Sequence, residues 1–242
     1  MQSPLYVALS SQIALQKRLD TIGANIANAS TTGYRADSVS FASLVSSPNT
    51  GAVAFVDQGD LSIDRRSGAL QQTGNTLDVA IEGDAWFALQ TPAGIAYTRD
   101  GRLSMSPNGQ LRSTTGHPVL DAGNAPIQVD PNGGSLTIAR DGMISQGGKK
   151  IAAIGVFHIP AEQTLTRFGD SAFLSSTEAE PMLDFHFVNV AQGYLEQSNV
   201  NTTTEMMNLI TVSRAFQGAA TVIDDTERKL DDAIRTLGAT GR

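Results

Sequence analysis

Side chains that could do chemistry are few in this sequence. It contains three histidines, His117, His158 and His186, and no cysteine. No two of the histidines lie at the spacing by which one helix or one strand presents a pair of metal ligands. The lack of cysteine excludes a disulfide framework, a thiolate metal site and a cysteine nucleophile. No Gly-x-Ser-x-Gly elbow and no phosphate-binding loop is present.

Carboxylates offer the other route to chemistry. Asp78 and Glu82, or Asp141, could serve a carbohydrate-active β protein, which needs two carboxylates converging in one cleft. The sequence gives no sign of that convergence. Asp121, Asp130 and Asp141 lack the alternating oxygen ligands and the terminal Glu of a calcium loop, and turn formation explains them better. We therefore predict no catalytic residue, no cofactor and no metal site.

The overall charge narrows the range of partners. Net charge is −7 and the pI is about 4.9, without a cluster of Lys and Arg. That balance argues against nucleic acid and against an anionic membrane surface. No segment approaches the ~20 apolar residues of a membrane-spanning helix, so we expect no direct membrane insertion. The first basic residue is Lys17, and polar residues interrupt the apolar run before it, so no Sec-type signal is expected.

The elements that must organise the chain are two stretches at its ends. Apolar positions recur at alternating steps of 3 and 4 in residues 4–28 and again in residues 204–237. This is the spacing of a coiled-coil seam, and a narrow seam needs a second helix to cover it. We expect Thr202, Thr203 or Thr204 to cap the second helix. The seam residues expected at helical assembly interfaces are Leu5, Leu15, Leu19, Ile22, Ile26, Met206, Leu209, Phe216, Ile223, Leu230, Ile234 and Leu237.

The middle of the chain has an alternating pattern punctuated by turn signals such as Asp100-Gly101 and Asp141-Gly142. Such dipeptides between alternating residues are typical of β-hairpins. Residues 151–160 form the most apolar run and predict a central strand.

We therefore predict an α+β chain in which N- and C-terminal helices pair as a coiled coil and an antiparallel β domain is inserted between them. The predicted parts are a discontinuous helical domain (1–35 and 200–242), an extended connector with little core of its own (36–72) and a β-rich domain (73–199).

Several motifs lie in order along nearly the whole chain. The first is ANIANASTTGYR (24–35), with Asn25, Asn28, Thr32, Gly33 and Tyr34. The middle holds LDVAIEGDAWF (77–87), YTRDG (97–101) and NGQL (108–111). The last is GYLEQSNVN (193–201), with Ser198, Asn199 and Val200, followed by EMMNLI (205–210) and RAF (214–216). These motifs resemble, in turn, the N-terminal signature, the β-domain core and the C-terminal motif of the bacterial flagellar rod and hook proteins.

The resemblance implies a structural subunit of the flagellar basal body. Such a subunit is exported unfolded by the flagellar type III apparatus, without a cleaved Sec signal, and assembles with itself and other rod proteins. The product is a helical tube across the periplasm that transmits motor torque to the hook and filament. The short chain and the brief connector after Arg35 favour the proximal rod. The middle motifs also resemble the distal rod protein, so a distal rod or hook-type axial protein remains the alternative.

Two other classes stay open from the residues alone. One is the carbohydrate-active enzyme described above. The other is a ligand-binding β module on a coiled-coil stalk, which would form a closed oligomer of fixed size rather than an open helical assembly.

The seam itself can be tested at its C-terminal end. Leu230→Asp or Ile234→Asp places a charge on the apolar stripe, so each should abolish motility while leaving the thermal unfolding of the β domain unchanged. Swimming assays and calorimetry measure the two effects. Loss of both together would indicate one continuous core instead.

Overall fold

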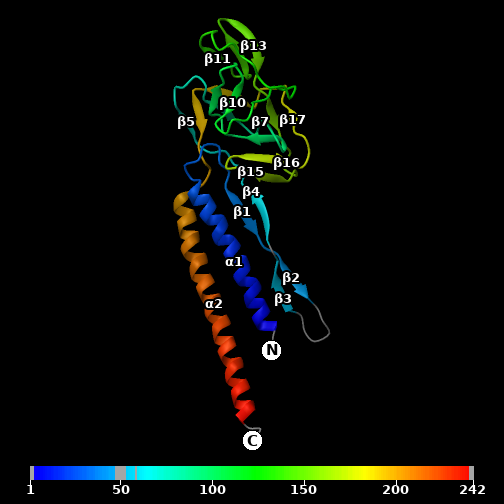
Figure 1. Ribbon diagram of the computed structural model, residues 1–242, viewed down its shortest axis with the longest axis vertical. Coiled ribbons are helices and arrows are strands. Elements are labelled where there is room, and N and C mark those ends of the chain that lie inside the picture. The colour runs from blue at the N-terminus through cyan, green and yellow to red at the C-terminus, as the bar shows by residue number, and fades with distance from the viewer. Residues whose placement is uncertain (1–2, 47–52, 58, 240–242) are drawn as a thin grey trace. The chain divides into compact units, whose positions relative to one another are not determined.

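The computed structural model (Figure 1) describes residues 3–46, 53–57 and 59–239. The chain forms two compact units, each built from more than one segment. Unit 1 contains residues 1–27, 37–62 and 201–242, and unit 2 contains residues 28–36 and 63–200. The predicted α+β class, with a helix near each end and an antiparallel β domain between them, is confirmed.

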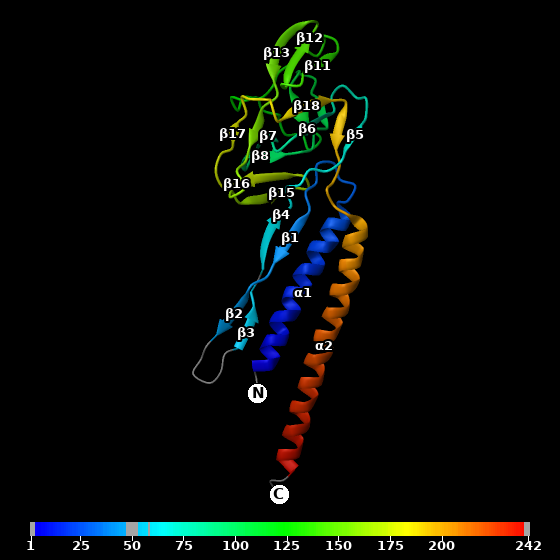
Figure 2. The same cartoon turned by 180° about the vertical axis from the view of Figure 1, so that it is seen from behind.

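Unit 1 is built around two long helices. Helix α1 (Ser3–Ala27) has 25 residues and helix α2 (Thr202–Ala239) has 38. They pack along each other in opposite directions, and α2 extends beyond the start of α1 (Figures 1 and 2). Within the described residues, neither helix is long and apolar enough to cross a membrane.

The cap of α2 differs from the prediction. The side-chain oxygen of Asn201 accepts a hydrogen bond of 3.1 Å from the backbone N–H of Thr204. Asn201, rather than one of the following threonines, is therefore the capping residue. Asparagine satisfies the free N–H groups of a first turn at least as well as threonine does, and Glu205 adds a favourable charge near the positive end of the helix dipole.

Among the described side chains of α1, Ile22 is the one predicted seam residue that is buried. Ala14 and Ile22 are buried, and Leu15, Leu19 and Ile26 are half-buried. The side chains of Leu5, Leu230, Ile234 and Leu237 lie outside the described part of the structure.

On α2 the inward face is shifted in the first turns. Val212 is 4% exposed, whereas Met206 is 53% exposed and Leu209 is 36% exposed. Glu205 and Asn208 occupy the inward positions instead, and they line a small cavity with α1 and β1 residues. Phe216 and Ile223 are half-buried further along. Met206 and Leu209 thus contribute little to the contact within one chain, because polar groups take the facing positions there.

Residues 37–62, expected to belong to an extended connector, form short strands that group with the helices. Strand β1 (Asp37–Ser40) pairs with β4 (Asp60–Ile63), and β2 (Ser43–Ser46) pairs antiparallel with β3 (Val53–Val56). Strands β1 and β3 lie against α1. The ammonium group of Lys17 on α1 also donates a 2.7 Å hydrogen bond to the carbonyl of Gly59. Helix α1 is therefore a packing partner of this segment within unit 1.

Unit 2 is a set of small antiparallel sheets. Its largest sheet has six strands in the order β15-β16-β8-β7-β14-β17. The bounds are β7 Trp86–Thr91, β8 Gly94–Thr98, β14 Val156–His158, β15 Leu165–Phe168, β16 Ala172–Ser175 and β17 Glu180–Pro181. A three-stranded sheet contains β11 (Leu136–Ile138), β12 (Met143–Gln146) and β13 (Lys149–Ala153) in chain order. Three two-stranded pairs complete the unit: β5 (Leu70–Gln72) with β19 (Tyr194–Glu196), β6 (Val79–Glu82) with β18 (Asn189–Gln192), and β9 (Leu103–Met105) with β10 (Leu111–Ser113).

Strand β7 is the centre of unit 2, because both of its faces are buried. Successive side chains of a strand point to opposite sides. Phe87 and Leu89 belong to one hydrophobic cluster, while Trp86 and Ala88 belong to another. A continuous apolar run such as Trp86–Leu89 is what a strand between two cores requires.

The predicted central strand at residues 151–160 is wrong in detail. This run divides into the end of β13 and the whole of β14. The break occurs at Gly155, where a side chain would lie 2.5 Å from the carbonyl oxygen of Asp121. Ile151 is 41% exposed on β13, and only β14 is paired with the central strand. Close approach of a neighbouring backbone, which hydropathy does not report, decides this division.

Val212 is the position at which the helix pair can be tested. Val212→Ala removes buried methyl groups and should lower the free energy of opening the pair by about 1–2 kcal/mol. Hydrogen exchange of α1 and α2 amides measures this opening. Met207→Ala, at a position 58% exposed, should change it by less than about 0.5 kcal/mol. Equal effects of the two substitutions would contradict the assigned inward face.

Candidate functional site

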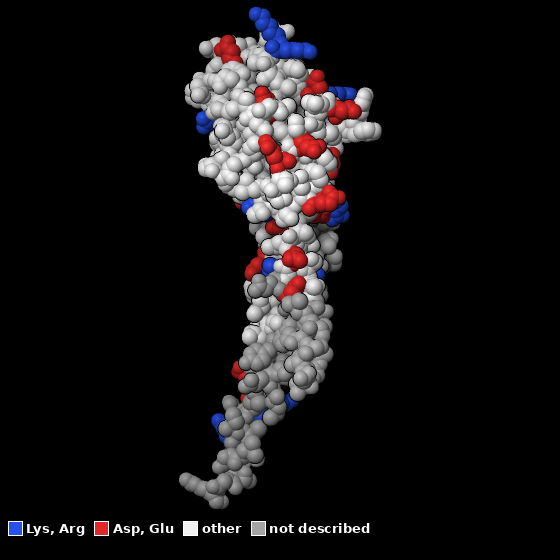
Figure 3. Space-filling view, turned by 90° about the vertical axis from the view of Figure 1, so that its right-hand side faces the viewer, with Lys and Arg blue, Asp and Glu red and all other residues white. Residues whose placement is uncertain are grey.

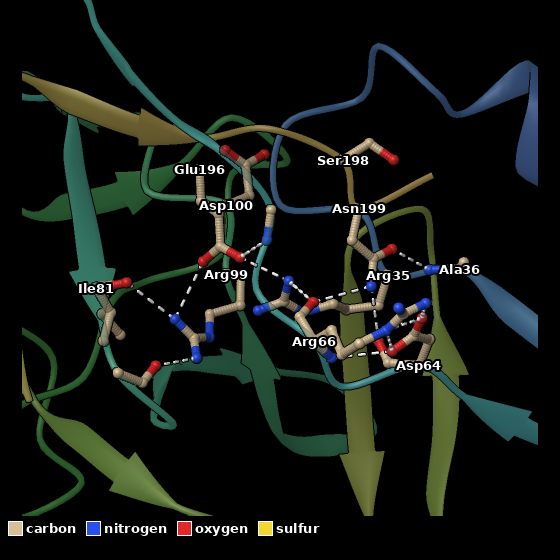
Figure 4. A network of polar contacts seen from close by, with 12 residues as sticks. Arg35, Ala36, Asp64, Arg66, Ile81, Arg99, Asp100, Glu196, Ser198 and Asn199 are labelled. Atoms are coloured by element: carbon tan, nitrogen blue, oxygen red, sulfur yellow. Dashed lines mark hydrogen bonds and ion pairs between the residues drawn. The ribbon is translucent and has the colours of Figure 1, made fainter. Parts of the chain in front are cut away.

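The first and last motifs of the sequence meet in unit 2. The backbone N–H of Gly33 donates to the carbonyl of Glu196 at 2.8 Å, and the N–H of Asn199 donates to the carbonyl of Tyr34 at 3.3 Å. The N–H of Ala36 donates to the side-chain oxygen of Asn199 at 2.7 Å. Two segments far apart in the sequence are thereby tied side by side (Figure 4).

Asn199 also holds a third segment. Its amide nitrogen donates to the carbonyl oxygens of Asp64 and Arg66, at 3.0 and 2.9 Å. The N–H of Asp64 donates to the carbonyl of Ala36 at 2.8 Å. One asparagine amide therefore joins residues 36, 64 and 66, and its donor and acceptor groups are both used.

A buried ion cluster lies beside these contacts. The carboxylate of Glu196 receives Nη1 of Arg35 at 2.6 Å on one oxygen and Nη1 of Arg99 at 3.0 Å on the other. The backbone N–H of Gly68 donates to the first of these oxygens at 2.8 Å. The side chains of all three charged residues are 0–1% exposed. We call Arg35, Arg99 and Glu196 the arginine–glutamate cluster.

The two guanidinium groups reach beyond the carboxylate. Arg35 also donates to the carbonyl of Arg66 at 2.6 Å. Arg99 donates to the carbonyls of Ile81, at 3.0 Å, and of Gly83. The cluster therefore connects the segments that carry residues 35, 66–68, 81–83 and 196. A buried charge held by several hydrogen bonds fixes these backbones in one arrangement.

Trp86 forms an aromatic wall of the cluster. The guanidinium carbons of Arg35 and Arg99 lie 5.6 and 5.4 Å from its ring centroid, within the range of a cation–π interaction. Four buried nitrogens, Nε and Nη2 of Arg35, Nε of Arg99 and Nε1 of Trp86, have no hydrogen-bond acceptor in the described structure. The ring faces offset part of that cost for the two arginines.

Burial has a clear electrostatic effect. Desolvation lowers the pKa of Arg99 to about 10, against the opposing attraction of Glu196. Desolvation also lowers the pKa of Arg35. Since the unfolded chain binds the proton of Arg99 more tightly, burying this charge costs stability at neutral pH, and the cost falls as the pH rises through about 10. With two cations and one carboxylate, Glu196 is the group whose loss would leave the others uncompensated.

Gly33 allows the backbone of the first motif (24–35) to lie against the backbone of Asp100, next to Arg99 of the cluster. Its φ is +68°, and a Cβ at this position would lie 2.3 Å from the backbone nitrogen of Asp100. Both the conformation and the space require glycine. The next residue, Tyr34, is buried, and the guanidinium of Arg167 lies 4.5 Å from its ring centroid.

Of the other predicted motif residues, Asn25 ties α1 to β1, and the rest lie in turns and loops. Asn25, in unit 1, exchanges two 2.9 Å hydrogen bonds with the backbone of Asp37. Asn28 accepts from the hydroxyl of Thr31 at 3.0 Å, and Thr32 is buried. Ser198 accepts from the N–H of Val200 at 3.2 Å.

Among the residues considered for chemistry, Asp78 is buried at a β-bridge, and the others described here lie in turns or on the surface. Asp78 accepts hydrogen bonds from Thr73 and Asn75, at 2.7 and 3.0 Å, and Asp141 accepts from the N–H of Met143. Glu82, His158 and His186 are exposed. No group of three or more potential metal ligands occurs among the described residues.

His117 lines a cavity of about 300 Å³ with Asp100, Arg102 and Thr114. Arg102 occupies both carboxylate oxygens of Asp100, at 2.9 and 2.7 Å.

Sequence reasoning placed Arg35, Arg99 and Glu196 inside motifs but did not select them as site residues. The available signal was charge: Arg35 and Glu196 are each the one charged residue of their motif, and Arg99 is followed by Asp100. Their mutual pairing depends on bringing residues 35, 99 and 196 together, which spacing alone does not indicate. Because the cluster is closed to solvent and its carboxylate is fully paired, it has a structural role: it holds chain segments together.

Comparison with known families accounts for most of the chain. Residues 5–35 match a family described as "Flagella basal body rod protein". Residues 80–146 match "Flagellar hook protein FlgE/F/G D1 domain", and residues 191–236 match "Flagellar basal body rod FlgEFG protein C-terminal".

Relatives that match over nearly their whole length are also named flagellar basal-body rod proteins. The chain is 46% identical over 239 residues to a "Flagellar basal-body rod protein FlgF" of Mesorhizobium japonicum, covering 99% of both chains. It is 34% identical to the protein of that name in Caulobacter vibrioides, covering 98% of this chain and 99% of the relative. It is 28% identical to a "Flagellar basal-body rod protein FlgG" of Bacillus subtilis, with 97% and 98% covered.

The cluster predicts a large effect of removing one charge. Glu196→Gln keeps the shape but leaves two buried cations without their anion, so unit 2 should lose about 3–5 kcal/mol of stability. Trp86 is the only tryptophan of the chain, and its fluorescence in urea reports this unfolding.

Glu180→Gln is the matched control, since Glu180 is exposed on β17. It should change the unfolding free energy by no more than about 0.5 kcal/mol. Equal stability of the two variants would mean that the cluster does not hold unit 2 together.

Proposed function

This chain belongs to the flagellar basal-body rod protein family and is a structural subunit rather than an enzyme, and on that premise we propose that it builds the proximal rod. In this proposal it assembles with itself and with other rod proteins into a helical tube. The tube carries motor torque to the hook and filament.

One observation carries the assembly mechanism: both helices of unit 1 keep large apolar side chains in solvent. These exposed residues are Leu9 and Ile13 on α1, and Met206, Met207, Ile210 and Val222 on α2. Neither the pairing of α1 with α2 nor the packing of β1 and β3 on α1 covers these side chains within one chain. Exposed apolar residues along two long helices favour contacts with further helices.

We propose that these faces form coiled-coil seams between subunits, including the predicted seam positions Met206 and Leu209. Each subunit would present one surface to the subunit above and a different one to the subunit below. Heterologous contacts of this kind generate open helical arrays when the rotation between copies does not close a ring. The predicted helical domain would then line the inside of the tube, and the β-rich domain would form its outer layer.

The arginine–glutamate cluster suits a subunit under load. The chain crosses between the two units at residues 27–28, 36–37, 62–63 and 200–201. The segments of unit 2 next to three of these crossings, at residues 34–36, 64–66 and 196–199, are those joined by Asn199, Arg35 and Glu196. Force that enters unit 2 through any one of them is shared with the others, so a single strand pair does not bear it alone.

The partners follow from this function. We propose that the subunit reaches the basal body through the flagellar type III export apparatus and that its neighbours are other rod proteins. The proximal position is favoured because two relatives named FlgF are 46% and 44% identical to this chain, compared with 28% for a relative named FlgG.

Substitutions on the open helical face test the assembly. Met206→Asp combined with Ile210→Asp places two charges where apolar contact with a neighbouring subunit is expected. The variant should abolish swimming in a strain that lacks its own copy, with its circular dichroism unchanged, because both side chains are more than half exposed within one chain.

Gln217→Asp provides the control, because it adds a charge at an exposed polar position of the same helix. It should leave swimming nearly normal. Normal swimming of the Met206 and Ile210 variant would rule out this face as an assembly surface.

A further inference from the structure

Strand β13 presents an unpaired basic edge. It is the outer strand of the sheet β11-β12-β13. Lys149, Lys150 and Ile151 are exposed, and the two lysines have no ion-pair partner in the described structure. They are the only lysines of unit 2. Lys and Arg side chains project at this end of unit 2 in Figure 3.

A second open edge of unit 2 has the opposite charge. Strand β17 is the outer strand of the six-stranded sheet, and exposed Glu180 lies on it. Asp184 follows and is also exposed. Between and beyond these acids, Leu183 is 85% exposed and Phe187 is 92% exposed. Acidic residues are spread over the face shown in Figure 3.

The two edges are distinct surfaces of one unit. Figures 1 and 2 both place β13 at one end of unit 2 and β17 along its side. A contact between them must therefore join two molecules, and it is heterologous, because each copy offers a different edge. Repetition of such a contact extends an array instead of closing a dimer.

We propose that β13 of one copy docks on residues 180–187 of a second copy. This inference rests on the proposed rod function and names one contact within it. Lys149 and Lys150, whose side chains leave opposite faces of the strand, would pair with Glu180 and Asp184. Complementary charge fixes the register and suppresses wrong partners.

The same contact covers exposed apolar residues. Ile151 of one copy lies against Leu183 and Phe187 of the other. Burying a phenylalanine and a leucine that are almost fully exposed in the single chain removes apolar surface from water and so favours the association of the two copies. The charges therefore orient the contact and the apolar side chains stabilise it.

Lysines on an edge strand also have a simpler role, because they discourage uncontrolled strand pairing. That role explains the basic edge alone. It gives no reason for two large apolar side chains in solvent beside an acidic edge, so the pairing of the two edges accounts for more of the surface.

Cross-linking tests the contact in assembled rods. The chain has no cysteine, so Ile151→Cys and Leu183→Cys introduce unique thiols. They replace the unmodified chain, together or singly, in an otherwise motile strain, and isolated basal bodies are treated with a short bismaleimide. The double variant should give a ladder of cross-linked copies, and each single variant should give none. A motile double variant without the ladder, or with adducts to another rod protein only, would overturn the proposal.

Charge exchange gives a second test that does not depend on the thiols. Lys149→Glu with Lys150→Glu should reduce swim-ring expansion at least about tenfold, and adding Glu180→Lys with Asp184→Lys should restore most of it. The matched control replaces the second pair by Glu162→Lys with Asp170→Lys, which gives the same net charge at exposed sites near the opposite edge of the six-stranded sheet. Equal rescue by the control would overturn the contact.

These outcomes are separable from failure of the proposed function. If a strain lacking the chain still swims and builds complete rods, the rod function itself fails. If that strain is non-motile and the unmodified chain restores it, a negative cross-linking or charge-exchange result concerns this interface alone.

Discussion

The structure of unit 2 depends on one buried carboxylate. Glu196 is held between Arg35 and Arg99. In the sequence of unit 2, Arg35 and Glu196 lie near opposite ends, and Arg99 lies between them. A buried ion pair adds little net stability compared with an apolar core, but it tolerates no partial assembly, because each charge is costly without its partner. The cluster therefore selects one arrangement of the chain. All charges are paired in only one arrangement of the segments around residues 35, 66–68, 81–83 and 196. Asn199 adds the same constraint through an amide whose donor and acceptor groups are both used.

The two units differ in how completely they bury their apolar side chains. In unit 2, strand β7 separates two hydrophobic clusters and is buried on both faces, so the β structure closes around itself. In unit 1, α1 and α2 cover only one stripe of each other, and the hairpin strands cover part of α1. Apolar residues remain exposed on both helices. This division suits a subunit that must join neighbours. Unit 2 folds around its own core, whereas the exposed apolar residues of unit 1 favour contact with other subunits.

Local residue patterns determined much of this architecture. Heptad spacing identified both helices, and alternation with turn dipeptides identified the β region, because these periods follow from backbone geometry alone. The break at Gly155 and the hairpin at residues 37–62 were not foreseen. Each depends on a distant neighbour, the carbonyl of Asp121 in one case and helix α1 in the other. Likewise, the polar Glu205 and Asn208 take inward positions on α2 because a cavity there is shared with polar groups of α1 and β1.

The same distinction applies to the site. By itself the sequence determined the family motifs, which include Gly33 and Asn199. Glycine favours left-handed turns, and an asparagine side chain hydrogen-bonds to backbone groups. Only the tertiary structure decided that Arg35, Arg99 and Glu196 form one cluster, with Trp86 against both guanidinium groups. Charge pairing depends on distance in space, and residues 35, 99 and 196 are brought together only when the sheets of unit 2 have closed.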